Sequence, residues 1–215
     1  MVTDQETARE ETFATLLGGR GGALDATLPS VGFVAGWLLT DQSIGWGAAI
    51  ALFVGAAVGL VRVLRGDRIR AVLVGMFVVA LAATVALYTG RAADFFLVQL
   101  VSNAASGMAF VVSWAIRWPL VGVVVGVLVG QKARWRRDPD LVRAYGRATL
   151  VYAVQYVLRV IVFGLLWWQD AVVALGVARV AMSWPLFVLM LGPTWWVFRR
   201  TLPADHPGLR HPRTA

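Results

Sequence analysis

The stretch that decides the fold is residues 44–64, IGWGAAIALFVGAAVGLVRVL, in which Arg62 is the only charged residue. About 20 consecutive apolar residues in a helix are enough to cross the roughly 30 Å hydrocarbon core of a bilayer. Arg65, Arg68 and Arg70 follow directly and mark a membrane surface. The segment is therefore predicted to be a transmembrane helix.

The composition of the whole chain extends this prediction. Hydrophobic residues make up 59% of the 215 residues and charged residues 15%. A chain of this length has too little interior to hide that much apolar surface from water. The net charge of +8 sits in short clusters between apolar runs, which is typical of membrane topology and not of nucleic-acid binding. We therefore predict an all-α, polytopic bundle of transmembrane helices.

Apolar runs along the chain predict about six crossings. They cover residues 24–39, 44–64, 69–87, 94–130, 148–168 and 171–198. The first run is short, and the fourth is too long, because a single helix over residues 94–130 would be about 55 Å in length. It must break, and Ser102–Gly107 and Arg117–Pro119 are the two candidate breaks. Leu120–Gly130 then either completes the crossing or lies re-entrant beneath it.

The basic residues orient these crossings. Residues 62–70, 131–147 and 199–215 hold 14 of the 20 basic residues, whereas the opposite turns hold only Arg91. Because short cytoplasmic loops carry the excess of arginine and lysine, both termini are predicted to be cytoplasmic, in the inner (plasma) membrane.

Three regions follow from this topology. Residues 1–23 are predicted to be a cytoplasmic leader with a short amphipathic helix around Glu6–Leu17, and not a signal peptide. Residues 24–198 form the transmembrane bundle, and residues 199–215 form a disordered cytoplasmic tail.

Polar residues within apolar runs are the candidate functional residues, because a buried arginine costs about 2.5–3.5 kcal/mol on insertion scales and faces the bundle interior. They are Arg159, Arg179, Asn103, Arg117, Gln155 and Asp94. Two interpretations stay open. Arg159 and Arg179 either bond to carbonyls and amides and lock the bundle, or they bind a lipid phosphate or an anionic solute. We expect both to point into the bundle, toward the layer of Asn103.

Other patterns concern partners. The basic stretch Lys132–Arg147 is either an orientation signal or a grip for anionic lipid headgroups. Glycines at helical spacing (Gly55 and Gly59; Gly122, Gly126 and Gly130) favour close helix packing within the chain or a homo-oligomer. Tryptophans such as Trp135 are predicted to be interface anchors, and Trp118-Pro-Leu is echoed at Trp184-Pro-Leu.

Enzymatic signatures are missing from the predicted spans. The two histidines, His206 and His211, lie in the tail, and the chain has no cysteine. No metal site, histidine-based triad or cofactor motif is therefore expected in the bundle, and the protein is predicted not to be an enzyme.

Several motifs of the chain resemble motifs of a known family and occur in the same order. They are LLGGRGGALDATLP at 16–29, GRAADFFL at 90–97, RWPLVG at 117–122, WRRDPDLVRAY at 135–145 and LGVAR at 175–179. Together they resemble an actinobacterial family of integral membrane proteins of unknown function, over about residues 13–202. The chain departs from that pattern at Val98, where many members have proline. More distantly, short motifs are similar to the intracellular septation protein A family.

The close resemblance implies a multi-pass inner membrane protein with no assigned activity. The distant one implies a cell-envelope role, in division or envelope maintenance. The leading hypothesis is accordingly a non-enzymatic envelope scaffold or assembly factor. The alternative is a transporter or channel-like protein for a small anionic solute or lipid.

Overall fold

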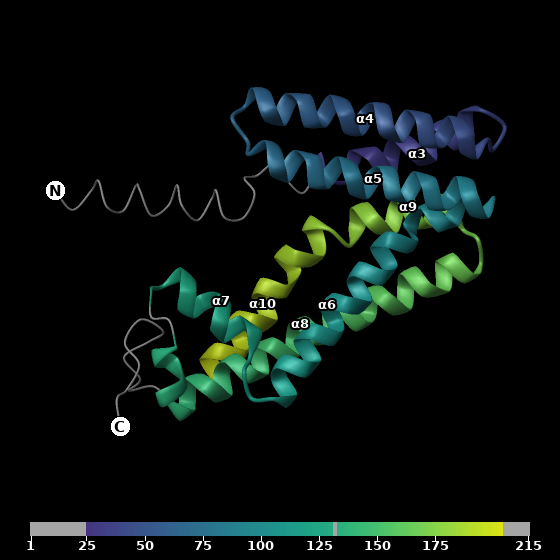
Figure 1. Cartoon of the computed structure of the whole chain (residues 1–215). Coiled ribbons are helices and arrows are strands. Elements are labelled where there is room, and N and C mark those ends of the chain that lie inside the picture. Colours follow the sequence, from purple (N-terminus) through teal and green to yellow (C-terminus); the bar gives the residue numbers. More distant parts are fainter. Residues whose placement is uncertain (1–24, 131–132, 204–215) are drawn as a thin grey trace. The chain divides into compact units, whose positions relative to one another are not determined.

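The structure is a computed structural model that describes residues 25–130 and 133–203 (Figure 1). Those residues form eight α-helices and two 3-10 helices and no strand, which confirms the all-α prediction. The expected leader helix at Glu6–Leu17 lies outside the described residues, as does the tail beyond residue 203.

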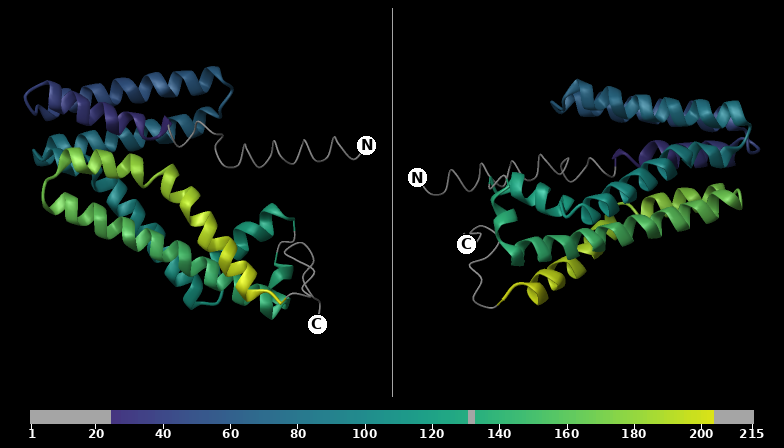
Figure 2. Two further views of the ribbon diagram at one scale, coloured as in Figure 1. Left: turned by 180° about the vertical axis from the view of Figure 1, so that it is seen from behind. Right: turned by 60° about the horizontal axis from the view of Figure 1, so that its bottom comes forward.

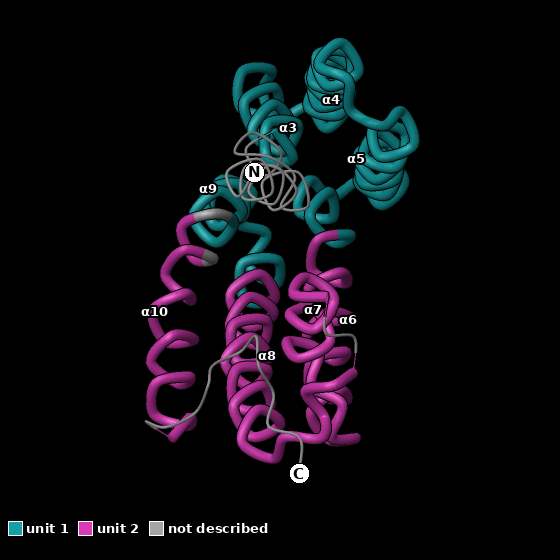
Figure 3. The backbone as a smooth tube through the Cα atoms, turned by 90° about the vertical axis from the view of Figure 1, so that its left-hand side faces the viewer, with its two compact units in different colours: residues 1–98, 165–184 teal, residues 99–164, 185–215 magenta. Residues whose placement is uncertain are grey.

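The chain divides into two compact units (Figure 3). The first comprises Met1–Val98 and Leu165–Trp184, and the second comprises Gln99–Gly164 and Pro185–Ala215. The bundle that the sequence predicts over residues 24–198 is thus built as two packed groups of helices.

The first unit is a group of packed helices in which α4 packs against both α3 and α5 (Figure 2). Its elements are α3 (Leu28–Leu39), α4 (Ile44–Leu64), α5 (Ile69–Thr89), η1 (Ala92–Phe96) and α9 (Val172–Ala181). Gly55 and Gly59 lie on the buried face of α4. A Cβ atom on Gly59 would stand 3.0 Å from the Val72 Cγ1 atom. These small residues therefore allow α4 to pack closely against α5 within the unit.

Four helical segments are long and apolar enough to cross a membrane, in the part of the chain that the structure describes. They are Ile44–Leu64, Ile69–Thr89, Ala92–Ala115 and Pro139–Trp168. Of the other two expected crossings, the first corresponds to α3, which has 12 residues, and the last is divided between α9, of 10 residues, and a following helix of 18 residues. The fold supports a membrane protein, and the number of crossings stays a prediction.

The second unit contains the predicted broken crossing. It contains α7 (Leu120–Leu128) and η2 (Arg134–Arg137), together with most of α6 (Leu97–Ala115), α8 (Pro139–Trp168) and α10 (Trp184–Thr201). The break falls at Arg117–Pro119, which confirms one of the two predicted positions. The predicted break at Ser102–Gly107 is wrong, because these residues lie within α6. Small residues do not interrupt a helix that a neighbour supports, and a Cβ atom on Gly107 would stand 3.2 Å from the Tyr156 Cβ atom.

A second break divides the last predicted crossing at Met182 and Ser183, between α9 and α10. Both copies of the Trp-Pro-Leu motif thus stand where a helix begins after an interruption. Proline suits that place because it lacks the N–H that a first turn leaves unpaired in any case. Helix α10 continues to Thr201, so the first residues of the predicted tail are helical and not disordered.

Candidate functional site

The break before α7 is stabilised by two hydroxyl groups. The first backbone N–H groups of any helix have no partner within that helix. Here the N–H of Leu120 donates to Ser113 Oγ (3.3 Å) and the N–H of Val121 donates to Thr149 Oγ1 (3.4 Å). Ser113 and Thr149 are both buried. The interruption is therefore a fixed part of the structure, supported from α6 and from α8.

Beneath the break lies an aromatic core. The Trp135 side chain is 1% exposed, and its ring meets that of Tyr145 edge to face at 5.4 Å between centroids. Tyr145 meets Phe198 of α10 in the same way at 5.6 Å. A Cβ atom on Gly122 would stand 3.0–3.1 Å from three atoms of the Trp135 ring. The prediction that Trp135 anchors the chain at a membrane interface is therefore wrong, because the ring fills the core of this unit.

Four arginines line an open cavity of about 640 Å³ in the same unit. We call this cavity the basic pocket, and its arginines are Arg117, Arg136, Arg143 and Arg147. Trp114 and Pro119 also line it. No acidic residue does so in residues 25–130 and 133–203. All four arginine side chains are exposed, so they face the medium around the helices.

Three of these side chains have an identified neighbour. The Arg136 guanidinium lies over the Trp118 ring, 3.9 Å from its centroid. Arg147 donates to the Thr201 hydroxyl at 3.0 Å. Arg143 lies 3.6 Å from the Asp140 carboxylate. These contacts restrict where the guanidinium groups point and leave most of their N–H donors available to a ligand.

Arg117 is held by its backbone. It lies in the turn after α6 with a φ of 55°, in the left-handed region that non-glycine residues rarely adopt. The turn is closed by hydrogen bonds from the N–H groups of Arg117 and Trp118 to the carbonyls of Trp114 and Ser113. The conformation therefore places a guanidinium at the break at a cost in backbone strain.

The chemistry of the basic pocket favours an anion with several oxygens. Guanidinium groups bind phosphate and carboxylate through paired hydrogen bonds, and they stack on aromatic rings. The adjoining N-terminus of α8 does not add to the pocket, because Asp138 Oδ1 already accepts the N–H groups of Asp140 and Leu141. An anion in the basic pocket would therefore be bound by the arginine side chains.

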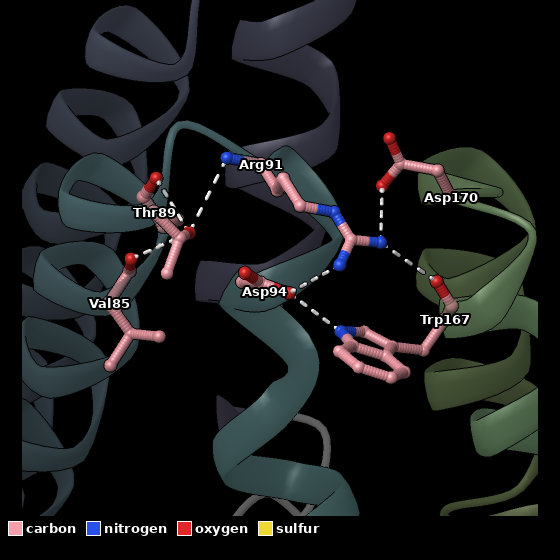
Figure 4. Close-up of polar contacts among 7 residues, drawn as sticks. Val85, Thr89, Arg91, Asp94, Trp167 and Asp170 are labelled. Carbon is pink, nitrogen blue, oxygen red and sulfur yellow. Dashed lines mark hydrogen bonds and ion pairs between the residues drawn. The ribbon is translucent and has the colours of Figure 1, made fainter.

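Asp94, a predicted site residue, lies in the first unit in a polar cluster of its own (Figure 4). Its buried carboxylate accepts the Trp167 indole N–H at 2.7 Å and lies 3.8 Å from Arg91 Nη1. Arg91 also reaches the Trp167 carbonyl at 3.4 Å and the Asp170 carboxylate at 3.7 Å. These contacts join two turns of the unit and compensate the buried charge without a ligand.

Arg179 also lies in the first unit. Its Nη2 atom donates to the Ala26 carbonyl at 3.2 Å, just before α3 begins. With Asp25 and Arg62 it lines a cavity of about 190 Å³. A hydrogen bond to a backbone carbonyl is what we expect if Arg179 stabilises the bundle. Asp25, the first residue that the structure describes, was not among the residues predicted from the sequence.

Asn103, Gln155 and Arg159 belong to the second unit. Asn103 and Gln155 are each 3% exposed, and Asn103 Oδ1 accepts a hydrogen bond from Gln99 at 3.2 Å. Arg159 lies 5.4 Å from the Tyr156 ring centroid. Gly107 of α6 contacts Tyr156 of α8, and the two helices run antiparallel. Asn103 and Arg159 each lie about one turn away in the same direction, so they lie at the same level. The expected approach of Arg159 to Arg179 stays a prediction, since the two lie in different units.

The structure thus brings Arg117 together with Arg136, Arg143 and Arg147 of the basic stretch, although the sequence pattern presents them as separate features. Pro119 signalled the break itself, and no local pattern signalled the cavity that Arg117 shares with α8.

No curated protein and no solved structure matches the chain. Residues 17–205 match the family described as "Protein of unknown function (DUF3159)", and the chain belongs to that family.

Proposed function

We propose that the protein is a non-enzymatic scaffold of the plasma membrane that holds the phosphate of an anionic lipid in the basic pocket. One observation carries the proposal: four arginines converge on one open cavity that no acidic residue lines among the described residues. A phosphate at a membrane surface is the anion that such a cavity meets most often.

Three further observations support this assignment. Trp114 and Trp118 are exposed beside the arginines, and tryptophan is enriched at the level of lipid headgroups. The positive-inside rule assigns the pocket to the cytoplasmic side. Four described helical segments are long and apolar enough to cross a membrane, which supports a role within the membrane.

Native mass spectrometry of the full chain tests the proposal. The chain is released from micelles that contain equal amounts of phosphatidylglycerol and phosphatidylcholine. We expect retained phosphatidylglycerol to predominate, and the double variant Arg136→Gln/Arg143→Gln to lose that preference. The control Arg134→Gln/Arg137→Gln removes two charges from the same segment but none from the pocket. Equal loss in both variants, or no preference in the parent chain, would refute the proposal.

A second candidate function rests on a different observation. Asn103 Nδ2, Gln155 Oε1 and Arg159 Nε are buried atoms without a hydrogen-bond partner in the structure. Unsatisfied polar groups within a membrane protein mark routes for polar solutes or ions. They favour a transporter or channel-like protein for a small anion.

Uptake of radiolabelled inorganic phosphate into proteoliposomes tests this second function. Uptake that Arg159→Gln abolishes and Arg137→Gln preserves would establish it. If proteoliposomes and empty liposomes take up phosphate at the same rate, this transport function is excluded.

A further inference from the structure

We infer that the basic pocket selects lipids whose headgroup carries two phosphates over lipids that carry one. This inference rests on the proposed function and adds the class of ligand. It follows from the charge of the pocket, from where its arginines come in the chain, and from its size.

The charge of the pocket exceeds what one phosphodiester can neutralise. Four guanidinium groups less the carboxylate of Asp140, which lies 3.6 Å from Arg143, leave three positive charges. A phosphodiester headgroup supplies one negative charge. Like charges that stay unpaired around one cavity repel each other, more strongly where the dielectric is low. A ligand with two phosphates removes most of that repulsion.

The arginines also form two separate sets. Arg143 and Arg147 lie one turn apart on α8, so their Cβ atoms are about 6 Å apart and both can reach one phosphate. Arg117 and Arg136 come from other elements, the turn after α6 and η2. The Trp118 ring beneath Arg136 fixes this second set beside the break. Two sets of guanidinium groups match two phosphates better than they match one.

The size of the cavity agrees with such a ligand. Its volume of about 640 Å³ lies within the range of about 300–1,000 Å³ that holds drug-sized ligands. One phosphate would leave much of it to water. Cardiolipin and polyprenyl diphosphates both carry two phosphates, and they share the chemistry that the pocket recognises.

Isothermal titration of the full chain in dodecyl maltoside micelles tests the inference. The titrants are phosphatidylglycerol, cardiolipin and a polyprenyl diphosphate, with inorganic phosphate and pyrophosphate as soluble counterparts. We expect at least one of the two-phosphate lipids to bind about tenfold more tightly than phosphatidylglycerol, well beyond the roughly twofold statistical gain from a second identical group. We also expect pyrophosphate to bind more tightly than inorganic phosphate if the headgroup alone is recognised.

The outcomes separate this inference from the proposed function. If both two-phosphate lipids bind within about twofold of phosphatidylglycerol, the inference is wrong and the proposed function stands. If none of the lipids binds, both fail. If the soluble anions do not bind while a two-phosphate lipid does, the inference holds and the acyl chains contribute to recognition.

Variants from each set provide the second readout. Arg117→Asn removes one charge with a residue that tolerates a positive φ, and Arg143→Gln removes one from α8. Each should bring the affinity for the preferred lipid to about that of phosphatidylglycerol. Arg137→Gln, in the same segment as Arg136 but outside the pocket, should leave it unchanged. If Arg117→Asn fails to fold, Arg136→Gln replaces it. Retained selectivity in both sets of variants would overturn the inference.

Discussion

Replacing Gly122 by alanine tests the packing that supports the basic pocket. The new Cβ atom would stand 3.0 Å from Trp135 Cη2 and 3.1 Å from Cζ2 and Cζ3. Because most Cβ contacts are longer than this, the indole ring or α7 must shift by a few tenths of an ångström. The ring cannot move freely, since it is 1% exposed and packs against Tyr145.

The expected loss follows from two opposing terms. Adding a methyl group to a filled core costs about 1–3 kcal/mol, whereas alanine is favoured over glycine in a helix by up to about 1 kcal/mol. Gly164→Ala isolates the second term, because Gly164 is helical in α8 and a Cβ atom there would meet nothing within 4 Å. The difference between the two variants is then the clash alone, about 1–3 kcal/mol.

Reversible unfolding of both variants in mixed micelles measures this difference. We expect Gly122→Ala to be the less stable variant, and Gly164→Ala to match or exceed the parent chain. Adding Trp135→Phe to Gly122→Ala should recover part of the loss, because the smaller ring makes room and the two changes are coupled. If Gly122→Ala is as stable as Gly164→Ala, the packing of α7 on Trp135 is refuted.

Three further predictions concern the turns and the topology. Arg117→Gly should raise the thermal unfolding temperature or leave it unchanged, because glycine relieves the strain of a φ of 55°. The same change should weaken binding of anionic lipid in micelles. If the variant binds the lipid as tightly as the parent chain does, Arg117 does not contribute to binding in the pocket. Trp167→Phe should destabilise the first unit by about 1.5–3 kcal/mol in denaturant titrations, since it deletes the donor of a charge-assisted hydrogen bond to buried Asp94. A change below about 0.5 kcal/mol would contradict that role. Asp140→Cys should resist impermeant thiol reagents in intact cells and react after lysis, whereas labelling from outside would reverse the predicted orientation.

Periodicity and hydropathy suffice to predict the simplest elements. Helices α4 and α5 follow directly from two apolar runs on either side of one arginine cluster, because length and polarity alone indicate a crossing. Pro119 predicts its break for a local reason, the missing backbone donor. The break at Ser102–Gly107 was predicted from small and polar residues, which a packed neighbour makes compatible with a helix.

The basic pocket could not be predicted because it depends on contacts between distant residues. Ser113 supports Leu120 across the turn, and Thr149 supports Val121 from a helix further along the chain. Nothing local in the sequence shows that Arg117 shares a cavity with Arg143. Arg179 illustrates the same limit, since its carbonyl partner, Ala26, lies 153 residues away.

Photo-cross-linking in native membranes tests most directly whether an anionic lipid occupies the basic pocket. A phosphatidylglycerol analogue with a diazirine on its headgroup is incorporated and activated, and the modified peptides are mapped by mass spectrometry. We expect cross-links to concentrate on peptides around residues 114–119 and 139–147, and to fall in Arg136→Gln/Arg143→Gln but not in Arg134→Gln/Arg137→Gln. Cross-links spread evenly over the basic segments, or concentrated at residues 62–70, would contradict a lipid site in the basic pocket.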